Sequence, residues 1–375
     1  MTSMSRLEKK LSDRLESRDY YEAHQIYRTL FYRMSAQGKW QQLQDLLYNG
    51  AIKLLDVNEP TSAIDLAELY VESLQKSNVP VSSAALDRFE QLFTRLPALL
   101  EKDTTPDGSR VDRRSEFLSR ALQWTMAVGG KKRYREKGHP DFHARVAKIV
   151  WREGNYVAAR NHFILSDDPE KFASFLIDFQ QRCGFKSEKD LFIAQAVLQI
   201  LCTRRAKMAA TLLQLYCEKH PEIGGEPPYQ LPLLNFMWLL TLCVQLRKVT
   251  YFSILVEQYQ KCLERDPSYR DYLDKIGQIY FGLPPPQKSA AGGLFGSILK
   301  GLLTNKAGTS SSTDSMAEED SEDDFSDEGA VDEEGYVTAA SSANAASPMT
   351  PASSPKLNAC SSSTVPTFED GMDLD

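Results

Sequence analysis

The sequence has no apolar run long enough to cross a membrane, and it shows hardly any alternation of apolar and polar residues with a period of two. A membrane-spanning helix needs about 18 to 20 mostly apolar residues. The nearest approach, residues 231–244, is followed by Gln245 and Arg247. The first residues are polar and lack the apolar core of a secretory signal. Because period-two alternation is typical of strands, we predict an all-α protein without stable membrane insertion.

Motifs for catalysis are missing as well. The chain contains no Gly-x-Ser-x-Gly, no glycine-rich phosphate loop and no dinucleotide fingerprint after a strand. His139 and His143 are four residues apart and can share one helix face, but no cysteine or carboxylate set completes a zinc site in the sequence. His24, His162 and His220 are isolated, and we interpret them as surface or packing residues. We predict no catalytic residue, no cofactor and no metal site.

The chain has few cysteines, and their positions show none of the close spacings that are typical of metal sites or disulfide frameworks. Most of the six cysteines lie inside apolar helical stretches, which is typical of reduced thiols in a cytosolic or nuclear protein. We predict a cytosolic location. The six positions are 183, 202, 217, 243, 262 and 360.

Charge is unevenly distributed along the chain. Residues 306–375 contain 2 basic and 16 acidic side chains, which leaves 42 basic and 35 acidic side chains in residues 1–305. We predict a basic folded unit followed by a disordered, acidic, Ser-rich tail over 306–375. Ser321 lies in an acidic run, and three other sites precede proline; the run is also typical of a tail that only solubilises the chain. The candidate phosphorylation sites are Ser321, Ser347, Thr350 and Ser354.

What the sequence has in abundance is apolar residues at spacings of three and four, as in amphipathic helices. With Gly, Pro and Asn as breaks, this pattern predicts roughly fourteen helices in about seven pairs. Asp19 is the candidate N-cap of the second helix, which stops at Gly38, and Pro60 opens the fourth. Further helices are expected near 81–96, 109–128, 140–153, 155–165, 169–183, 188–203, 205–219, 231–246, 248–265 and 269–282.

A short motif recurs where two such helices would meet. It reads GNYVAA at residues 154–159 and DYYEA at 19–23, with weaker versions that end in Ala63 and Ala210. The small last residue lets antiparallel helices approach closely, and the repeat distance of about 40 to 50 residues matches one helix pair. The pattern predicts a superhelical, tetratricopeptide-like α-solenoid with an N-terminal half at 1–153 and a C-terminal half at 154–283. Solenoids provide surface for partners.

Three segments interrupt this pattern. Residues 220–230 are rich in Pro and Gly and predict a loop inserted in the C-terminal half, whether a protruding hairpin or an ordinary connector. Residues 284–305 predict an extended segment with a short amphipathic helix, which docks on another protein, folds back or lies on a membrane surface. Residues 131–137 (KKRYREK) predict a basic loop, either solvated or bound to nucleic acid.

Three stretches carry a resemblance to a known family. Residues 19–30 (DYYEAHQIYRTL), 154–163 (GNYVAARNHF) and 269–281 (YRDYLDKIGQIYF) resemble the Golgi-to-ER traffic protein four family, over about residues 5–303. The resemblance implies a non-catalytic adaptor of the tail-anchored protein targeting pathway. Its N-terminal helices would bind the targeting ATPase, and its C-terminal helices would bind a ubiquitin-like adaptor protein or, in animals, a BAG-six scaffold. Client transfer would be promoted by proximity.

The resemblance also implies where these partners bind. His24, Arg28 and Asp65 match the polar residues that the family uses toward its ATPase, although solvated helix residues would look the same. The Pro-rich loop and the aromatic residues of the late helices would form an apolar cleft for the second partner, although most of these aromatics are equally typical of a core. The residues implied for this cleft are Pro221, Tyr229, Phe236, Trp238, Tyr251, Phe252 and Tyr259.

The chain departs from the family in two places. Residues 220–230 are short for the partner-clasping hairpin expected in some family members, and the resemblance does not explain the acidic tail.

Two other hypotheses compete with the adaptor interpretation. A generic helical-repeat scaffold, such as a proteasome-lid or translation-factor subunit, would require a winged-helix segment with short strands after the repeats. Nucleic-acid binding through residues 131–137 is the weaker alternative, and we expect no nucleic acid as a partner.

Overall fold

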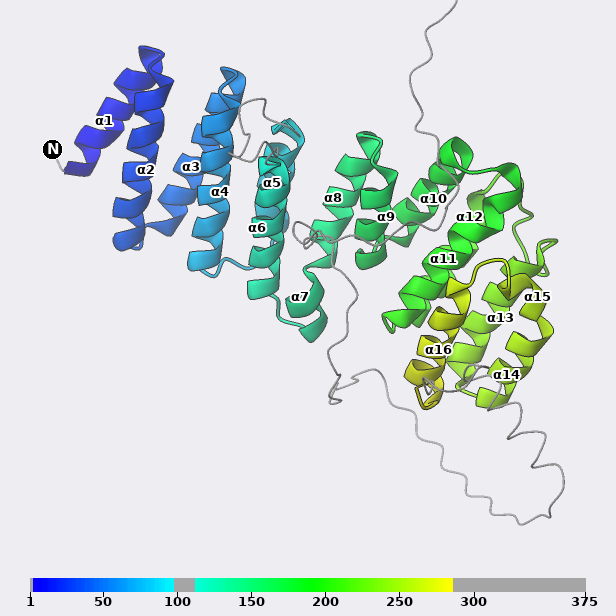
Figure 1. The fold of residues 1–375 in the computed structure, drawn as a ribbon. Coiled ribbons are helices and arrows are strands. Elements are labelled where there is room, and N and C mark those ends of the chain that lie inside the picture. The colour runs from blue at the N-terminus through cyan, green and yellow to red at the C-terminus, as the bar shows by residue number, and fades with distance from the viewer. Residues whose placement is uncertain (1–2, 98–111, 286–375) are drawn as a thin grey trace, which may run out of the picture. The chain divides into compact units, whose positions relative to one another are not determined.

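The computed structural model describes residues 3–97 and 112–285, with side chains from residue 6 onward. The predicted tail, its phosphorylation sites and the amphipathic stretch after Pro285 lie outside these residues. All regular elements of the described residues are helical, which confirms the all-α prediction (Figure 1). They are α1 Ser3–Glu16, α2 Tyr20–Ala36, α3 Trp40–Asp56, α4 Pro60–Lys76, α5 Ser83–Arg95, α6 Arg113–Ala127, α7 Lys132–Lys137, α8 Pro140–Arg152, α9 Tyr156–Leu165, α10 Pro169–Cys183, η1 Lys186–Glu188, α11 Lys189–Cys202, α12 Ala206–Lys219, α13 Pro232–Leu246, α14 Val249–Gln258, α15 Gln260–Leu263 and α16 Ser268–Phe281.

Tight turns with a fixed spacing connect the first helices. Arg18, Gly38, Asn58 and Asn78 follow one another every 20 residues, and each has a positive φ between 50° and 66°. In each turn the next residue's N–H bonds back to a carbonyl five residues earlier, as from Lys39 to Met34 at 3.0 Å. This closure satisfies carbonyls at the helix end, and after the first three turns the next helix begins two residues later. Two helices with their turns therefore make a unit of 40 residues.

The recurring motif sits immediately after these turns. The side chains of Asp19 and Asn155 accept hydrogen bonds from backbone N–H groups three residues later, so both are N-caps as the sequence predicts for Asp19. The fourth residue after the cap is a fully buried alanine in both cases and again after Glu59. After Arg205 the equivalent position is Ala209, which is buried, and not Ala210, which is half-buried. The prediction for Ala210 was therefore wrong by one residue.

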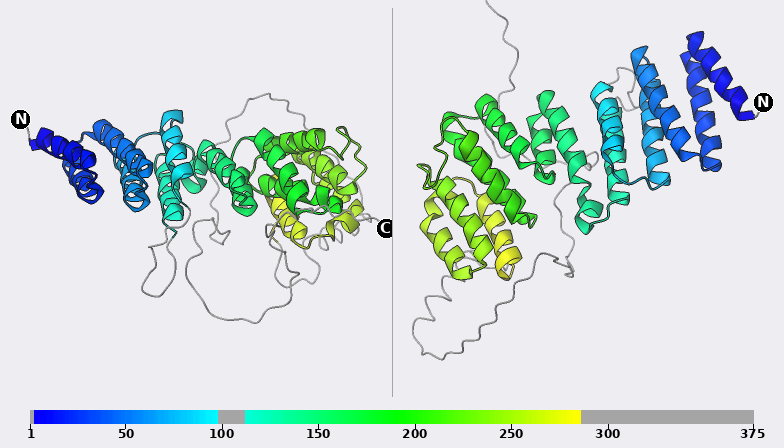
Figure 2. Two further views of the ribbon diagram at one scale, coloured as in Figure 1. Left: turned by 90° about the horizontal axis from the view of Figure 1, so that it is seen from above. Right: turned by 180° about the vertical axis from the view of Figure 1, so that it is seen from behind.

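The helices pack mainly with their neighbours in the chain. α1 packs with α2, α3 with α4, and α8 with α9, and successive pairs contact each other through α2–α3, α4–α6 and α5–α8 (Figures 1 and 2). After α9 the order is less regular, because α10 packs mainly on α12, and α16 returns to pack on α11. All described helices belong to one compact unit, Met1–Gly329.

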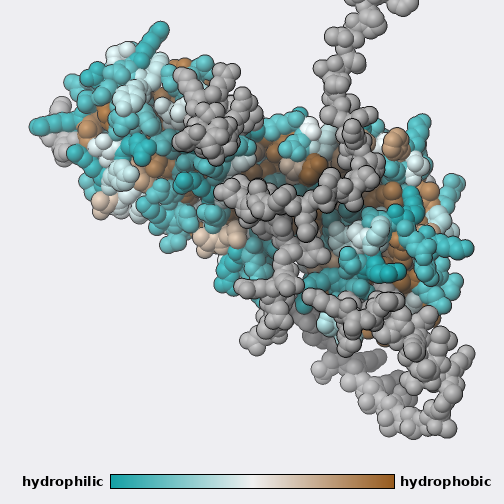
Figure 3. All heavy atoms as spheres, in the orientation of Figure 1, coloured by the Kyte–Doolittle hydropathy of each residue, from teal (hydrophilic) through white to brown (hydrophobic). Residues whose placement is uncertain are grey.

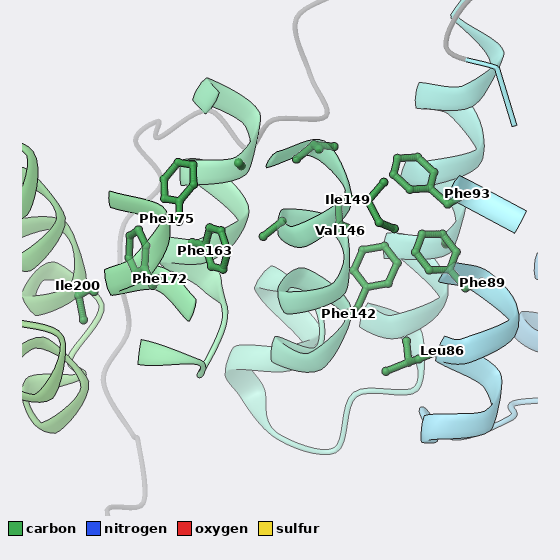
Figure 4. Packing of buried hydrophobic residues seen from close by; sticks show 14 of the residues in the cluster. Leu86, Phe89, Phe93, Phe142, Val146, Ile149, Phe163, Phe172, Phe175 and Ile200 are labelled. Carbon is green, nitrogen blue, oxygen red and sulfur yellow. The ribbon is translucent and has the colours of Figure 1, made fainter. Parts of the chain in front are cut away.

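Aromatic side chains fill the seams between these pairs. Phe89 of α5 lies 5.5 Å from Phe117 of α6 and 4.8 Å from Phe142 of α8, ring centre to ring centre. Figure 4 shows Phe89 and Phe142 facing each other, with Phe163 and Phe172 together in the next seam. Phe163 and Phe172, from α9 and α10, stack at 5.4 Å. The buried residues thus form one continuous core, as a solenoid requires.

Two segments differ from the sequence predictions. Residues 132–137, predicted as loop, form the short helix α7, and Gly138 at its end has a φ of 91° with no space for a side chain beside Leu122. Residues 248–265, predicted as one helix, split into α14 and α15 at Tyr259. Residues 220–231 contain turns and bends but no strand, so this loop is not a β-hairpin.

Candidate partner-binding surfaces

His24, Arg28 and Asp65 meet in one cluster, which we call the polar cluster. His24 and Arg28 lie one turn apart on α2, and Asp65 lies on α4, 41 and 37 residues away in sequence. The Nε2–H of His24 donates to Oδ2 of Asp65 at 2.7 Å, and Nη1 of Arg28 donates to Oδ1 at 3.0 Å. One carboxylate therefore fixes the orientation of both basic side chains.

The electrostatics of the polar cluster keep Asp65 ionised. Burial by itself raises the pKa of Asp65, but the hydrogen bond from His24 and the charges of Arg28 and Arg113 outweigh it, so the pKa lies below its usual value. The side chain of Arg28 is 40% exposed, whereas those of His24 and Asp65 are 13% and 20% exposed. Arg28 is consequently the most accessible member of the polar cluster.

Three further residues, which the sequence did not single out, extend this cluster. Glu68 lies one turn after Asp65 on α4, is nearly buried, and is 3.3 Å from Arg113 and 3.8 Å from Arg120 of α6. Burial raises the pKa of Glu68 despite these two arginines. The i, i+3 spacing of Asp65 and Glu68 is visible in the sequence. The contact of Glu68 with α6 is not, because α6 follows residues 98–111 and its position relative to α4 is known only from the structure.

The residues expected to form the C-terminal cleft separate into two groups. Phe236 and Phe252 are fully buried: Phe236 packs on Tyr259, and Phe252 stacks on Phe281 with ring centres 4.7 Å apart. Tyr229 is 8% exposed, and its backbone exchanges two hydrogen bonds of 2.6 Å with the Asn235 side chain. These residues hold the core and the loop and do not present a surface to a partner.

The second group stays accessible. Tyr251 is 49% exposed and Pro221 is exposed, whereas Trp238 and Tyr259 are half-buried. Around Tyr251, the end of α13 and the start of α14 carry other exposed apolar side chains, and Figure 3 shows hydrophobic residues, in brown, at the surface among the C-terminal helices. We call this set the α13–α14 apolar corner. It consists of Leu242, Leu246, Val249, Tyr251 and Ile254, which are 36–59% exposed.

The histidines at 139 and 143 do not share a site. His139 caps α8 by accepting from the N–H of Asp141, whereas both ring nitrogens of the buried His143 are engaged. Its Nε2–H donates to the carbonyl of Lys137 at 2.7 Å, so its Nδ1 accepts from Nδ1–H of His162 at 2.8 Å. Within residues 3–97 and 112–285, no group of three or more His, Cys, Asp or Glu is placed to hold a metal ion. No helix in the same residues is long and apolar enough to span a bilayer.

The stacked helix pairs and their continuous core define a helical-repeat protein. Comparison with known proteins gives the family. The model of the Golgi to ER traffic protein 4 family matches residues 37–303. The Golgi to ER traffic protein 4 homologs of Bos taurus and Homo sapiens are 43% and 42% identical over 300 residues, which is 80% of this chain and 87% of each relative. This chain belongs to the Golgi to ER traffic protein 4 family.

A solved structure agrees with the fold. The crystal structure of C. therm. Get4 superposes with a TM-score of 0.64 and covers 82% of this chain and 97% of that chain, at 23% sequence identity. The helical-repeat architecture is therefore shared with that structure.

Proposed function

We infer that this chain is a non-catalytic, cytosolic adaptor in the post-translational targeting of tail-anchored membrane proteins to the ER. Its first helices bind the targeting ATPase, and its last helices bind a ubiquitin-like adaptor protein or a BAG-six scaffold. The observation that carries this proposal is the polar cluster, because Asp65 of α4 meets His24 and Arg28 of α2 and leaves Arg28 exposed. Holding two proteins together raises their effective concentration without any chemistry.

The polar cluster suits a charged partner. The guanidinium of Arg28 has five N–H donors, and its Nη1 is held by Asp65, so the group is oriented before a partner arrives. A carboxylate on the ATPase is the matching acceptor. Because the cluster is partly exposed, the contribution of this contact should fall with ionic strength.

The test is a titration of the ATPase onto the full chain and onto Arg28→Ala and Asp65→Asn variants at low salt. We expect Arg28→Ala to weaken binding by about tenfold or more and to reduce its salt dependence. Arg88→Ala is the matched control, since Arg88 forms a similar ion pair with Asp45 at 2.7 Å between α3 and α5. Equal affinities for all variants, or an equal loss in the control, would exclude the polar cluster as the ATPase site.

The α13–α14 apolar corner is the proposed surface for the second partner. Exposed apolar residues in such a group are typical of protein–protein contacts, and Tyr251 supplies an aromatic anchor beside Lys248, whose Nζ lies 5.7 Å from the ring centre. Tyr251→Ser together with Leu246→Ser should weaken capture of the ubiquitin-like protein or the BAG-six scaffold. Phe185→Ser, which removes an exposed apolar side chain elsewhere, should leave capture unchanged.

The alternative scaffold classes gain no support. Residues 231–283, all within the described part, form helices α13 to α16 with their connections, and no strand of a winged helix occurs among them.

A further inference from the structure

Helices α9, α10 and α11 together bring three aromatic side chains to the surface of the solenoid. The rings of Tyr156 (α9) and Phe179 (α10) stack with their centres 5.1 Å apart, and Phe192 (α11) meets Phe179 edge to face at 5.0 Å. All three residues are half-buried. Phe163 and Phe172, by contrast, are fully buried in the seam below. The three surface rings therefore remain partly open to a ligand.

One turn along the same helices, this surface becomes polar. Arg160 follows Tyr156 by four residues on α9, so the two side chains are neighbours on one side of that helix. Gln195 follows Phe192 by three residues on α11 and is its neighbour in the same way. Nη1 of Arg160 donates to Oε1 of Gln195 at 2.9 Å. The aromatic and polar contacts therefore close into one ring of half-buried residues across α9, α10 and α11.

Arg160 carries a charge that the fold leaves without a counter-ion. Among residues 3–97 and 112–285, no carboxylate forms an ion pair with it, and its Nε is buried without a hydrogen-bond partner. Burial lowers the pKa of Arg160. Arg114, Arg145 and Arg205 each have a carboxylate partner. Because a partly buried charge without a counter-ion is unfavourable, a ligand that brings a carboxylate to Arg160 would be stabilised there.

Helix α16, which packs on α11, extends the polar part (Figure 1). Gln199, one turn after Gln195, donates from Nε2 to the hydroxyl of Tyr272 at 3.0 Å. This hydroxyl can still donate its own proton. Arg160 and Tyr272 are therefore bonded to successive turns of one side of α11. We call the following residues the aromatic–arginine face: Tyr156, Phe179, Phe192, Arg160, Gln195 and Tyr272.

The acidic residue beside the rings is already engaged. Oδ2 of Asp178 accepts from Nε1 of Trp151 at 2.7 Å and from the hydroxyl of Tyr156 at 3.2 Å. Its Oδ1 accepts from Nε of Arg182 at 2.6 Å. The charge of Asp178 is thus compensated within α10, whereas that of Arg160 is not. A ligand with a ring and a carboxylate would place its ring on the aromatic part and its carboxylate at Arg160.

We propose that the aromatic–arginine face binds segment 322–328 (EDDFSDE) of the same chain. Phe325 supplies the ring, and Asp323 and Asp327 each lie two residues away from it. The segment has five acidic residues and no basic residue, so its charge complements that of Arg160. A bound segment covers this face and competes with any other ligand that combines an aromatic ring with a carboxylate. The proposal does not rest on the proposed ATPase site or on the α13–α14 apolar corner.

The spacing within the segment matches the spacing on the face. In an extended peptide, side chains two residues apart point to the same side and lie about 7 Å apart. Neighbours one turn apart on a helix, such as Tyr156 and Arg160, lie about 6 Å apart. Phe325 therefore packs on the rings while Asp323 or Asp327, depending on the direction of the peptide, binds Arg160.

The described chain ends near this face. Tyr272 and the last residue of α16, Phe281, are nine residues apart, which is about 14 Å along a helix. Thirty-six residues then separate Pro285 from Glu322. A flexible chain of this length has a mean end-to-end distance of about 35 Å, and it reaches about 125 Å when fully extended. Tethering through it gives an effective concentration of about 1 mM, so a weak contact is sufficient.

Photocrosslinking on the full chain tests the contact. The photoreactive amino acid p-benzoylphenylalanine replaces Phe325, and a mixture of unlabelled and ¹⁵N-labelled chains distinguishes links within one molecule from links between two. We expect intramolecular crosslinks to α9, α10 and α11 near Tyr156, Phe179 and Phe192. The same probe in place of Phe368, which also has an aspartate two residues away but follows a longer linker, should give fewer links to this face.

Charge variants identify the role of the carboxylates. Asp323→Asn with Asp327→Asn should reduce the crosslinks about fivefold or more, because hydrogen bonds between charged groups are stronger than those to a neutral amide. These substitutions leave every described residue unchanged, so the loss would not come from unfolding. Arg160→Gln should give a similar loss. The control Arg270→Gln removes an exposed charge on another side of α16 and should have no effect.

Four results would overturn the proposal. The crosslinks could form only between different molecules, or fall on the α13–α14 apolar corner instead of α9 to α11. They could persist undiminished in the double Asp323→Asn and Asp327→Asn variant. More links to the face from position 368 than from position 325 would show that segment 322–328 is not its ligand.

Discussion

At the scale of single residues, close approach between helices depends on a few small side chains. Gly50 of α3 faces the buried ring of Tyr27 on α2, and a Cβ at position 50 would lie 2.7 Å from two ring atoms. The ring is buried in a close-packed core, so it cannot shift without displacing its neighbours. This glycine is therefore required by packing, although glycine is otherwise unfavourable inside a helix.

Gly50→Ala should therefore destabilise the protein. Overpacking costs about 1 to 3 kcal/mol, which exceeds the gain of about 1 kcal/mol from the better helix former. We expect a lower midpoint in urea unfolding, and a partial rescue by Tyr27→Leu, which removes the clashing ring. A Gly50→Ala protein at least as stable as the original would show that α2 and α3 can separate without cost.

The histidine pair predicts how stability depends on pH. Burial lowers the pKa of His143 to about 4 and that of His162 to about 3, from an ordinary value near 6.5. Below pH 6.5 the unfolded chain takes up protons that the folded chain does not, so the free energy of unfolding falls as pH falls from 6.5 toward 4. The loss is up to about 1.4 kcal/mol per pH unit for each imidazole. Urea unfolding at pH 7 and at pH 5 measures it, and His162→Gln should reduce the difference.

At the scale of helices, most of the fold can be predicted from the sequence because the residues at the turns are of types that start or end helices. Asp19 and Pro60 were identified as helix starts from residue type alone, and both are confirmed. α7 was missed because its six residues are too few for a periodicity, and they lie between glycines. α13 is apolar on nearly every side, so its sequence could not separate the core residue Phe236 from the exposed Leu242 and Leu246.

The same limit applies to the polar cluster. The family resemblance selected His24, Arg28 and Asp65, but helix periodicity alone does not say that α2 and α4 bring them into contact. That contact depends on the turns after α2 and α3, which bring α2 and α4 against each other. The contact of Glu68 with Arg113, which extends the cluster to α6, could be recognised only in the structure.

Helices α5, α6 and α8 are connected by one buried arginine. Arg114 donates from Nε to the carbonyl of Phe93 at 3.0 Å, packs over the Phe93 ring and forms two hydrogen bonds with Glu153, just after α8. Arg114→Met should lower the free energy of unfolding by about 2 to 4 kcal/mol, because bidentate, desolvated contacts are strong. Thermal unfolding measures the loss.

Arg95→Ala is the matched control for Arg114→Met. Its ion pair with Asp56 is exposed on both sides and should contribute less than about 1 kcal/mol. Similar losses of unfolding free energy in the two variants would mean that the contacts of Arg114 do not stabilise the packing of α5, α6 and α8.

At the scale of the whole molecule, each helix pair is stabilised mainly by its neighbours, because the contacts follow the order of the chain. α1 packs chiefly on α2, whereas α11 contacts α12, α13 and α16. In such an array, local opening near one end need not open the other. The two proposed surfaces lie on different parts of this array, one on α2 and α4 and the other on α13 and α14. A partner bound at one surface therefore need not alter the other.

Hydrogen exchange on two core variants tests this independence. Leu30→Ala in α2 and Leu198→Ala in α11 remove side chains that are equally buried, and each should cost about 2 to 5 kcal/mol locally. We expect Leu30→Ala to speed exchange of amides in α1 to α4 and to leave α11 to α16 unchanged, with the opposite pattern for Leu198→Ala. If either variant speeds exchange evenly along all described helices, the molecule opens as one cooperative unit. Its two surfaces would then be coupled through global stability, and a partner bound at one surface would also stabilise the other.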